Sequence, residues 1–361
     1  MKVYQRFILA LGLVLISGPL VCQDYRIAVI PKKESKWGYM NLKGEMIVPP
    51  ISWLGLPSTT DGTVLTTATG FTTSPKVLYD REGREIEPDI KVKIVNDAWS
   101  GEIFGFRGNM LRQVDGGKWG AINSKGKVTV PFLYDELTDF DDGYALGKRD
   151  KTYYVVDTQG GEQQIERNED ITYIKHFSEG LAPIELNNKQ FGFVDKQGKI
   201  IVEPAYLTVG YFSGGYAFVR APDNKIGFVD RKGNIVIEPK FSEVRGFDKE
   251  SGLAIAKYRS SDPDGSYTDT TGNMITFTIA EKYDGFFEGL SPAMLGKKYG
   301  YLNNKGTWAI MPVFDDAAPF NNGYAPAKSG KYWGIINTKA EWVLQPIYKD
   351  LGVVVKLEEA K

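Results

Sequence analysis

The chain has 361 residues, a formal net charge of −1, 42% hydrophobic residues and 13% aromatic residues. This apolar content is sufficient for a packed interior and excludes an intrinsically disordered chain. The near-neutral charge, with no basic stretch interleaved with aromatic residues, argues against nucleic-acid binding, which needs clustered Lys and Arg to neutralise phosphates.

Residues 1–22 have the pattern of a secretory signal peptide. Lys2 and Arg6 form the positive start, residues 7–16 are almost entirely apolar, and Pro19 breaks the pattern before a cleavage site. We expect cleavage after Cys22 and export of residues 23–361 to the periplasm, the cell surface or the medium. An uncleaved anchor and a lipoprotein modified at Cys22 are the alternatives. Cys22 is the only cysteine, so the mature chain has no disulfide and we expect no transmembrane span in it.

A short turn pattern recurs along the rest of the chain. An Asp or Asn is followed three residues later by Gly, or once by Ala, at spacings of 34 to 43 residues. The Asx caps the turn with its side-chain oxygen and the Gly adopts a positive φ, which predicts a hairpin at each copy. The nine copies are Asn41–Gly44, Asp80–Gly83, Asn123–Gly126, Asp157–Gly160, Asp195–Gly198, Asp230–Gly233, Asp269–Gly272, Asn303–Gly306 and Asn337–Ala340.

Each copy predicts three strands. One precedes the turn, and a second follows it as consecutive apolar residues, such as those at 235–237, which indicates burial on both faces. A proline, such as Pro239, is then expected to end the second strand. The third element has the pattern Phe-x-x-Gly-(Leu/Tyr)-(Ala/Ser), as at residues 140–145, with a longer variant at 247–254.

An aromatic or apolar residue and a glycine precede most of these hairpins, as in Trp37-Gly38, Trp119-Gly120 and Trp333-Gly334. Together with the turn, the apolar strand, the proline and Phe-x-x-Gly, this pattern resembles the WG-repeat proteins of bacteria. The resemblance implies tandem all-β repeats, often exported, and supplies no catalytic residue. Three copies depart from it, with Val77, Tyr154 and Ser266 in place of the glycine.

The sequence therefore predicts an all-β fold, a tandem array of about nine units of ~37 residues. An open curved stack is favoured, because propeller blades usually have four strands and number four to eight; a closed propeller-like ring is the alternative. Residues 51–115 are irregular, and residues 57–74 within them are expected to form a loop.

Recurrence separates structural residues from candidates for chemistry. Paired acids such as Asp135-Glu136 and Asp315-Asp316 recur in one column, so we assign them turn or surface roles. His176 is the only histidine and occupies a variable position that we expect to be exposed. No metal site, phosphate loop or dinucleotide motif is present, so no cofactor, no metal and no catalytic residue are predicted.

Aromatic residues are the remaining candidates. We expect the tryptophans within the repeat pattern to belong to the core, namely Trp37, Trp119, Trp308, Trp333 and Trp342. Trp53 and Trp99 lie outside the repeating columns, in the irregular region. They are predicted to bind a ligand by stacking on a sugar ring or on a partner's side chain.

The sequence favours a non-catalytic binding or scaffold module of the cell envelope, with a polysaccharide or a protein as partner. The rival is a glycan hydrolase built on the repeat array, with two carboxylates from Asp97, Glu102 and Asp115 near Trp99. A structural spacer is the third interpretation.

Overall fold

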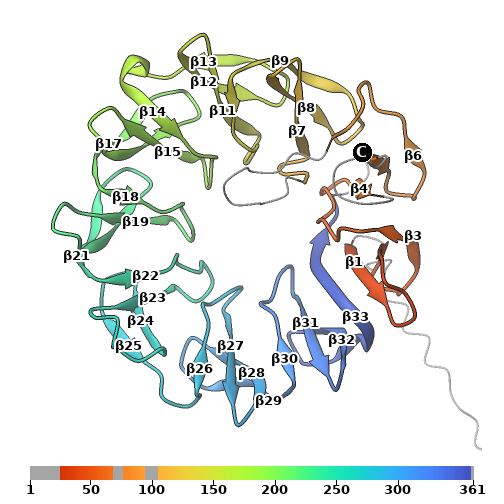
Figure 1. Cartoon of the computed structure of the whole chain (residues 1–361). Coiled ribbons are helices and arrows are strands. Elements are labelled where there is room, and N and C mark those ends of the chain that lie inside the picture. The colour runs from red at the N-terminus through yellow and green to blue at the C-terminus, as the bar shows by residue number, and fades with distance from the viewer. Residues whose placement is uncertain (1–24, 68–75, 94–104, 359–361) are drawn as a thin grey trace, which may run out of the picture.

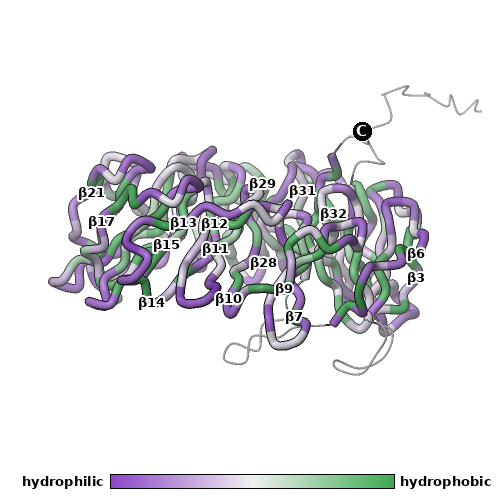
Figure 2. Tube along the Cα trace, turned by 90° about the horizontal axis from the view of Figure 1, so that it is seen from above, coloured by the Kyte–Doolittle hydropathy of each residue, from purple (hydrophilic) through white to green (hydrophobic). Residues whose placement is uncertain are grey.

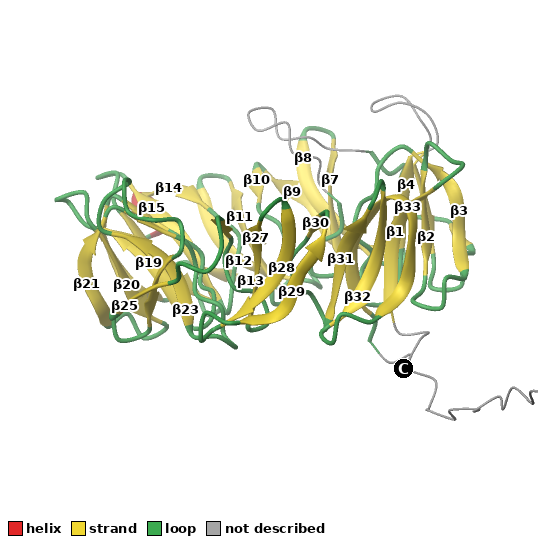
Figure 3. Ribbon diagram, turned by 90° about the horizontal axis from the view of Figure 1, so that it is seen from below, coloured by secondary structure: helices red, strands yellow, loops and turns green. Residues whose placement is uncertain are grey.

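The computed structural model describes residues 25–67, 76–93 and 105–358, and it is built from antiparallel sheets arranged around a ring (Figure 1). The predicted signal peptide and Cys22 lie outside the described residues. Seen from the side, the ring is flatter than it is wide (Figures 2 and 3). No helix within the described ranges is long and apolar enough to cross a membrane.

The first three units occupy residues 25–134. Unit 1 contains β1–β3, unit 2 contains β4–β6 and unit 3 contains β7–β9. The prediction of a loop at residues 57–74 is partly wrong, because residues 64–67 of this stretch form strand β4. The bounds are β1 Tyr25–Pro31, β2 Trp37–Met40, β3 Met46–Ser52, β4 Val64–Thr67, β5 Lys76–Tyr79, β6 Glu85–Ile86, β7 Met110–Asp115, β8 Lys118–Asn123 and β9 Val128–Tyr134.

Units 4 to 6 have four strands each, one more than predicted. The additional strand comes first in the unit and is only two residues long in units 4 and 6. Its bounds, with those of the other strands and one 3₁₀ turn, are β10 Glu136–Leu137, β11 Tyr144–Arg149, β12 Thr152–Asp157, β13 Glu162–Gln164, η2 Asn168–Asp170, β14 Ile171–Ile174, β15 Leu181–Leu186, β16 Phe191–Asp195, β17 Ile200–Tyr206, β18 Thr208–Val209, β19 Tyr216–Arg220, β20 Ile226–Asp230 and β21 Ile235–Phe241.

Units 7 to 9 repeat the four-stranded pattern and end in one long strand, β33. The bounds are β22 Glu243–Val244, β23 Leu253–Lys257, β24 Ser266–Asp269, β25 Met274–Thr276, β26 Lys282–Tyr283, β27 Leu290–Leu295, β28 Lys298–Asn303, β29 Trp308–Phe314, β30 Asp316–Ala317, β31 Tyr324–Ser329, β32 Tyr332–Asn337 and β33 Trp342–Lys356.

All nine predicted hairpins are present, and each is closed by the expected contacts. In unit 6 the Gly233 amide donates to the Asp230 carbonyl at 3.0 Å, and the Asp230 carboxylate accepts from the amides of Lys232 and Asn234. Gly233 has φ +86°, and Ala340, the one non-glycine at this position, also has a positive φ of 64°. The turn chemistry read from the sequence is therefore confirmed.

The proline was expected to end the second strand, but the strand continues past it. The proline lies inside a bulge of that strand. In unit 6, Phe228 pairs with Ile237 and Ile226 pairs with Phe241, so two residues of one strand face four of the other across Pro239. The strand is also the outer edge of its sheet, and Ile235 is 46% exposed while Ile237 is 3% exposed. The prediction of burial on both faces is therefore wrong.

This bulge explains the glycine of the Trp-Gly pair. A Cβ on Gly227 would lie 2.3 Å from the Ile237 carbonyl oxygen, and no such contact is tolerated in folded proteins. The corresponding distances in the other units that have the motif are 2.8 Å at Gly38, 2.7 Å at Gly120, 2.3 Å at Gly192, 2.4 Å at Gly300 and 2.5 Å at Gly334. In the three units with Val77, Tyr154 or Ser266 instead, the same two strands pair without a register shift.

The interior consists mainly of tyrosine, phenylalanine and β-branched residues, with the Phe of each Phe-x-x-Gly turn between neighbouring sheets. Phe177 and Phe212 are 0% and 2% exposed. Apolar and polar stretches are interspersed around the whole ring, as the hydropathy colouring shows (Figure 2). The five tryptophans assigned to the core are only partly buried, so that prediction is correct only in part; Trp37, for example, packs against Gly55 and the cluster around Tyr39.

The two ends of the array meet in one seven-stranded sheet. The first part of β33 pairs with β32, and its last part pairs with β1, with Tyr25 opposite Lys356 and Ile27 opposite Val354. Unit 1 therefore takes its innermost strand from the C-terminal end of the chain. The sheets otherwise stay separate and form no continuous barrel. The sequence left two shapes open, an open curved stack and a closed ring. The pairing of the two ends of the chain gives the ring arrangement (Figure 1).

We predict that Gly227→Ala destabilises the protein by about 1–3 kcal/mol, because the new methyl group would displace the bulged strand. Gly285→Ala is the matched control, because a Cβ there would make only ordinary contacts, the nearest at 3.6 Å. Urea unfolding of both variants measures the difference. Equal stability of the two variants would contradict the role assigned to the close approach.

We predict that Val354→Asp weakens the joint between the ends by about 3–5 kcal/mol, because it places a charge among Ile27, Val29 and other buried apolar residues. Val354 is 1% exposed, whereas its neighbour Val353 is 49% exposed. Val353→Asp should therefore change stability by less than about 0.5 kcal/mol. Thermal unfolding compares the two, and a similar loss in both variants would argue against this joint.

Candidate functional site

Hydrogen bonds between successive units follow the Phe-x-x-Gly turns around the ring. In these turns the residue before the glycine has a positive φ, for example 50° at Glu179 and 52° at Glu288. The Glu179 carboxylate accepts from the amides of Gly214 and Gly215 at 2.9 and 2.8 Å, and Glu288 accepts from the turn of unit 9 in the same way. These recurring acids therefore bind neighbouring backbone amides.

Similar hydrogen bonds link other pairs of neighbouring units. Asp142 accepts from the Gly180 amide at 2.6 Å, and Asp248 accepts from the Gly289 amide at 3.0 Å. Near the joint, Asn322 donates to the Val354 carbonyl at 3.0 Å, and the Glu358 amide donates to Thr60. The acids predicted to be structural by recurrence, Asp135 and Asp315, likewise form surface ion pairs with Lys118 and Lys298.

The repeat pattern also changes between units 5 and 6. A hollow of about 910 Å³ opens there, and its lining includes Asp142, Glu179, Lys196, Arg231 and Lys249. We call it the unit 5–6 hollow. Its walls come from the Phe-x-x-Gly turns of units 4 to 7 and the hairpin turns of units 5 and 6. The hollow lies within the size range of ligand-binding sites.

Three departures from the repeat columns create this hollow. The second residue of the hairpin turn is Lys196 or Arg231 here, whereas most other units have Leu, Ser, Thr or Asn. Gly214 replaces the acid or amide of its column. The turn of unit 7 is two residues longer and provides Lys249. A Cβ on Gly214 would lie 3.1 Å from the Phe247 carbonyl, so this glycine makes room for the longer turn.

The charged groups of the hollow differ in how they are bound. Three carboxylates balance three cations, but Asp142, Glu179 and Asp195 accept hydrogen bonds from backbone amides. Lys196 donates to the Asp142 carbonyl at 3.2 Å. Within the part of the chain that the structure describes, Arg231 and Lys249 make no hydrogen bond or ion pair, and both are exposed. Their donors are therefore available to a ligand.

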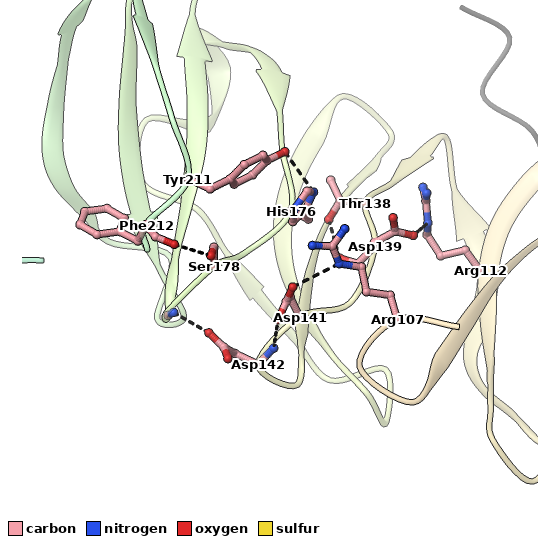
Figure 4. A network of polar contacts seen from close by, with 11 residues as sticks. Arg107, Arg112, Thr138, Asp139, Asp141, Asp142, His176, Ser178, Tyr211 and Phe212 are labelled. Atoms are coloured by element: carbon pink, nitrogen blue, oxygen red, sulfur yellow. Dashed lines mark hydrogen bonds and ion pairs between the residues drawn. The ribbon is translucent and has the colours of Figure 1, made fainter. Parts of the chain in front are cut away.

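A second polar cluster adjoins the hollow (Figure 4). His176 and Tyr211 stack with ring centroids 4.1 Å apart, and the Tyr211 hydroxyl and His176 Nδ1 are 3.0 Å apart. Arg107 pairs with Asp141 at 3.2 Å. Burial, together with the positive charge of Arg107, lowers the pKa of His176 to about 4. His176 is partly buried, so its expected exposure is wrong.

The structure places one of the two predicted ligand-binding tryptophans. Trp53 is 48% exposed, follows β3, and has the Lys36 ammonium 5.5 Å from its ring centroid. Trp99 lies outside the described residues, so its role stays a prediction. Asp97 and Glu102, proposed for a hydrolase, also lie outside them. Asp115 is exposed at the end of β7 and lies 3.8 Å from Lys93.

Sequence reasoning did not single out the residues of the unit 5–6 hollow, although signals for them were present. Two adjacent hairpin turns with Lys or Arg, a glycine in an acid column and a lengthened turn are all visible in the sequence. What the sequence lacks is the information that these departures face one another. Over the described ranges, no group of three or more His, Cys, Asp or Glu is placed to bind a metal ion.

His176 predicts a specific loss of stability as the pH falls. Its pKa of about 4 in the folded state is below the ordinary value near 6.5, so the unfolded chain binds the extra proton between these values. Stability should therefore fall by about 1–2 kcal/mol from pH 7 to pH 5. Denaturant unfolding of His176→Asn, which keeps an acceptor for Tyr211, should show a flatter dependence. Because this is the only histidine, an unchanged slope would exclude it as the cause.

Of three similar solved structures, only the first aligns closely enough to support the fold, and it supports the fold alone. A eukaryotic initiation factor shares 10% identity, with 91% of this chain and 97% of that chain covered and a TM-score of 0.56. PorZ, a surface component of the type-IX secretion system of Porphyromonas gingivalis, shares 11% identity over 87% and 48% of the two chains, with a TM-score of 0.32. BamB from Moraxella catarrhalis shares 11% identity over 77% and 90%, with a TM-score of 0.31. No curated protein matches the sequence.

The family comparison matches more than half of the chain. The family described as "WG containing repeat" matches residues 37–51, 119–153, 171–189, 191–225, 226–260, 299–333 and 333–355. These stretches contain the six glycines that approach the bulged strands. They leave out the hairpin turns of units 2, 4 and 7, the three units in which that glycine is replaced. The chain therefore belongs to the WG containing repeat family.

Proposed function

We propose that this protein is an exported, non-catalytic binding or scaffold module of the cell envelope, and that the unit 5–6 hollow is its binding site. The observation that carries the proposal is the convergence of three departures from the repeat pattern on one hollow. Residues that only build a repeat recur in every copy, whereas Lys196, Arg231 and Lys249 do not. Their position is readily explained by a ligand.

The chemistry of the lining favours an acidic polysaccharide as the partner. Arg231 and Lys249 offer donors that suit carboxylate, sulfate or phosphate groups. The lining contains no aromatic residue on which a neutral sugar ring would stack. Trp53 offers such a surface on unit 1, so a long polymer contacting both regions is consistent with the arrangement.

The described carboxylates support a binding role over hydrolysis. A glycosidase keeps one carboxylic acid protonated by raising its pKa. Every described carboxyl group whose pKa departs from its ordinary value departs downward, as in Asp135, where the Lys118 ammonium lowers it, and Asp315, where Lys298 does so. The hydrolase alternative rests on two of Asp97, Glu102 and Asp115, and their replacement by Asn and Gln tests it.

We predict that the mature protein binds an acidic glycan such as polygalacturonate, and that binding weakens at least tenfold in the double variant Arg231→Ala, Lys249→Ala. Lys232→Ala is the matched control, because this exposed neighbour does not line the hollow. Binding is measured by calorimetry, with dextran as a neutral glycan and poly-glutamate as an acidic peptide. Trp53→Ala is measured alongside to test the stacking prediction.

Three outcomes would count against the proposal. Binding of none of these probes by a folded sample argues against a binding module of this kind. Binding that the double variant leaves unchanged moves the site away from the hollow. A preference for poly-glutamate over the glycans replaces the polysaccharide with a protein partner.

A further inference from the structure

A smaller pocket lies between units 1 and 2, next to the joint between the two ends of the ring. Its volume is about 280 Å³, and its lining consists of Arg26, Asn41, Glu45, Ile47, Arg81 and Glu82. These residues come from β1, from the hairpin of unit 1 and the strand that follows it, and from the hairpin turn of unit 2. The Arg81 guanidinium also donates to the Glu358 carbonyl at 2.6 Å, so the pocket adjoins the C-terminal strand.

Arg26 is a singular residue at its position in the repeat. The residue that pairs with the hairpin Asx is apolar in units 3 to 9, for example Leu181 opposite Asp195 and Leu290 opposite Asn303. In unit 1, Ile27 pairs with Met40, which places Arg26 at the corresponding position opposite Asn41. A buried cation has thus replaced an apolar side chain in a column where packing does not require it.

The guanidinium of Arg26 is buried without enough partners. The residue is 3% exposed, and its Nη2 donates to the Arg81 carbonyl at 2.6 Å. Nε and Nη1 are buried and have no hydrogen-bond partner in the structure. Leaving the donors of a buried charged group unpaired is costly, and such groups in folded proteins are normally satisfied by a protein atom, a water or an ion.

The two acids of the pocket, Glu45 and Glu82, are hydrogen-bonded to residues other than Arg26. Glu45 accepts from the Asn41 side chain at 2.7 Å, and Glu82 accepts from Arg84 at 2.7 Å. Burial and the nearby charge of Arg81 lower the pKa of Arg26 to about 10, although the charges of Glu82 and Asp80 act in the opposite direction. No acceptor of the described chain is hydrogen-bonded to Nε or Nη1 of this guanidinium.

We propose that this pocket binds an oxyanion, a phosphate, sulfate or carboxylate group held by the positive charge and the unpaired donors of Arg26. A guanidinium offers charge-assisted N–H donors that suit such groups. A pocket of about 280 Å³ admits a small ion or the acidic group of a larger ligand. Because its walls come from units 1 and 2, the bound anion holds these two units together beside the C-terminal strand. This site is independent of the unit 5–6 hollow.

The test compares the thermal stability of the full mature chain in phosphate, sulfate and chloride at matched ionic strength. We expect a saturable rise in Tm of at least about 2 °C with phosphate or sulfate relative to chloride. Arg26→Leu, which installs the residue of several other units, should abolish the rise and be at least as stable as the wild type in chloride. Lys43→Leu, on the same hairpin but outside the pocket lining, should keep it.

A second variant and two further ligands make the test more specific. Arg26→Lys retains the charge but loses the planar set of guanidinium donors, so its response should be several-fold weaker, and this variant replaces Arg26→Leu if the latter does not fold. Glucose 6-phosphate and glucuronate distinguish a free ion from the acidic group of a larger ligand. The absence of any anion dependence in the wild type, or an equal response in the Arg26 variants, would overturn the site.

Discussion

The close approach between one glycine and one carbonyl sets the geometry of the repeat. In six units the outer strand bulges toward the neighbouring strand, and at Gly227 a Cβ would lie only 2.3 Å from the carbonyl of Ile237. A bulge increases the local twist of a sheet and bends the strand that carries it. Pro239 fits there because the bulged backbone leaves its nitrogen outside the ladder.

Repetition also explains how this chain distinguishes construction from recognition. Acids such as Glu179 and Glu288 would look reactive in isolation, yet both bind amides of the next unit. The candidates for recognition are the residues that differ from those at the same position in the other repeats. Arg231 and Lys249 face a hollow, and Arg26 lies buried with unpaired donors at the joint. In a repeat protein, a break in the pattern is therefore the most informative feature of a site.

Much of the fold could be predicted from the sequence because its signals are local. The turn at Asp230–Gly233 depends on residues within five positions, and all nine such turns are present. The strand Thr208–Val209 was missed because two residues carry no periodicity. The pairing of β1 with β33 was also out of reach, since nothing near Ile27 indicates that its partner is Val354. The hollow required knowledge of which turns face each other, which only the folded chain supplies.

The shared strand has a consequence for the order in which the protein assembles. Units 4 to 8 are each formed from one continuous stretch, so each has its strands available as soon as that stretch is free to fold. Unit 1 is different, because Ile27 and Val29 at the start of the chain are covered by residues near its end. The first unit to be synthesised is thus the last to be finished. Contacts at such long sequence separation are slow to form, and until then an apolar strand edge stays open at the N-terminal end.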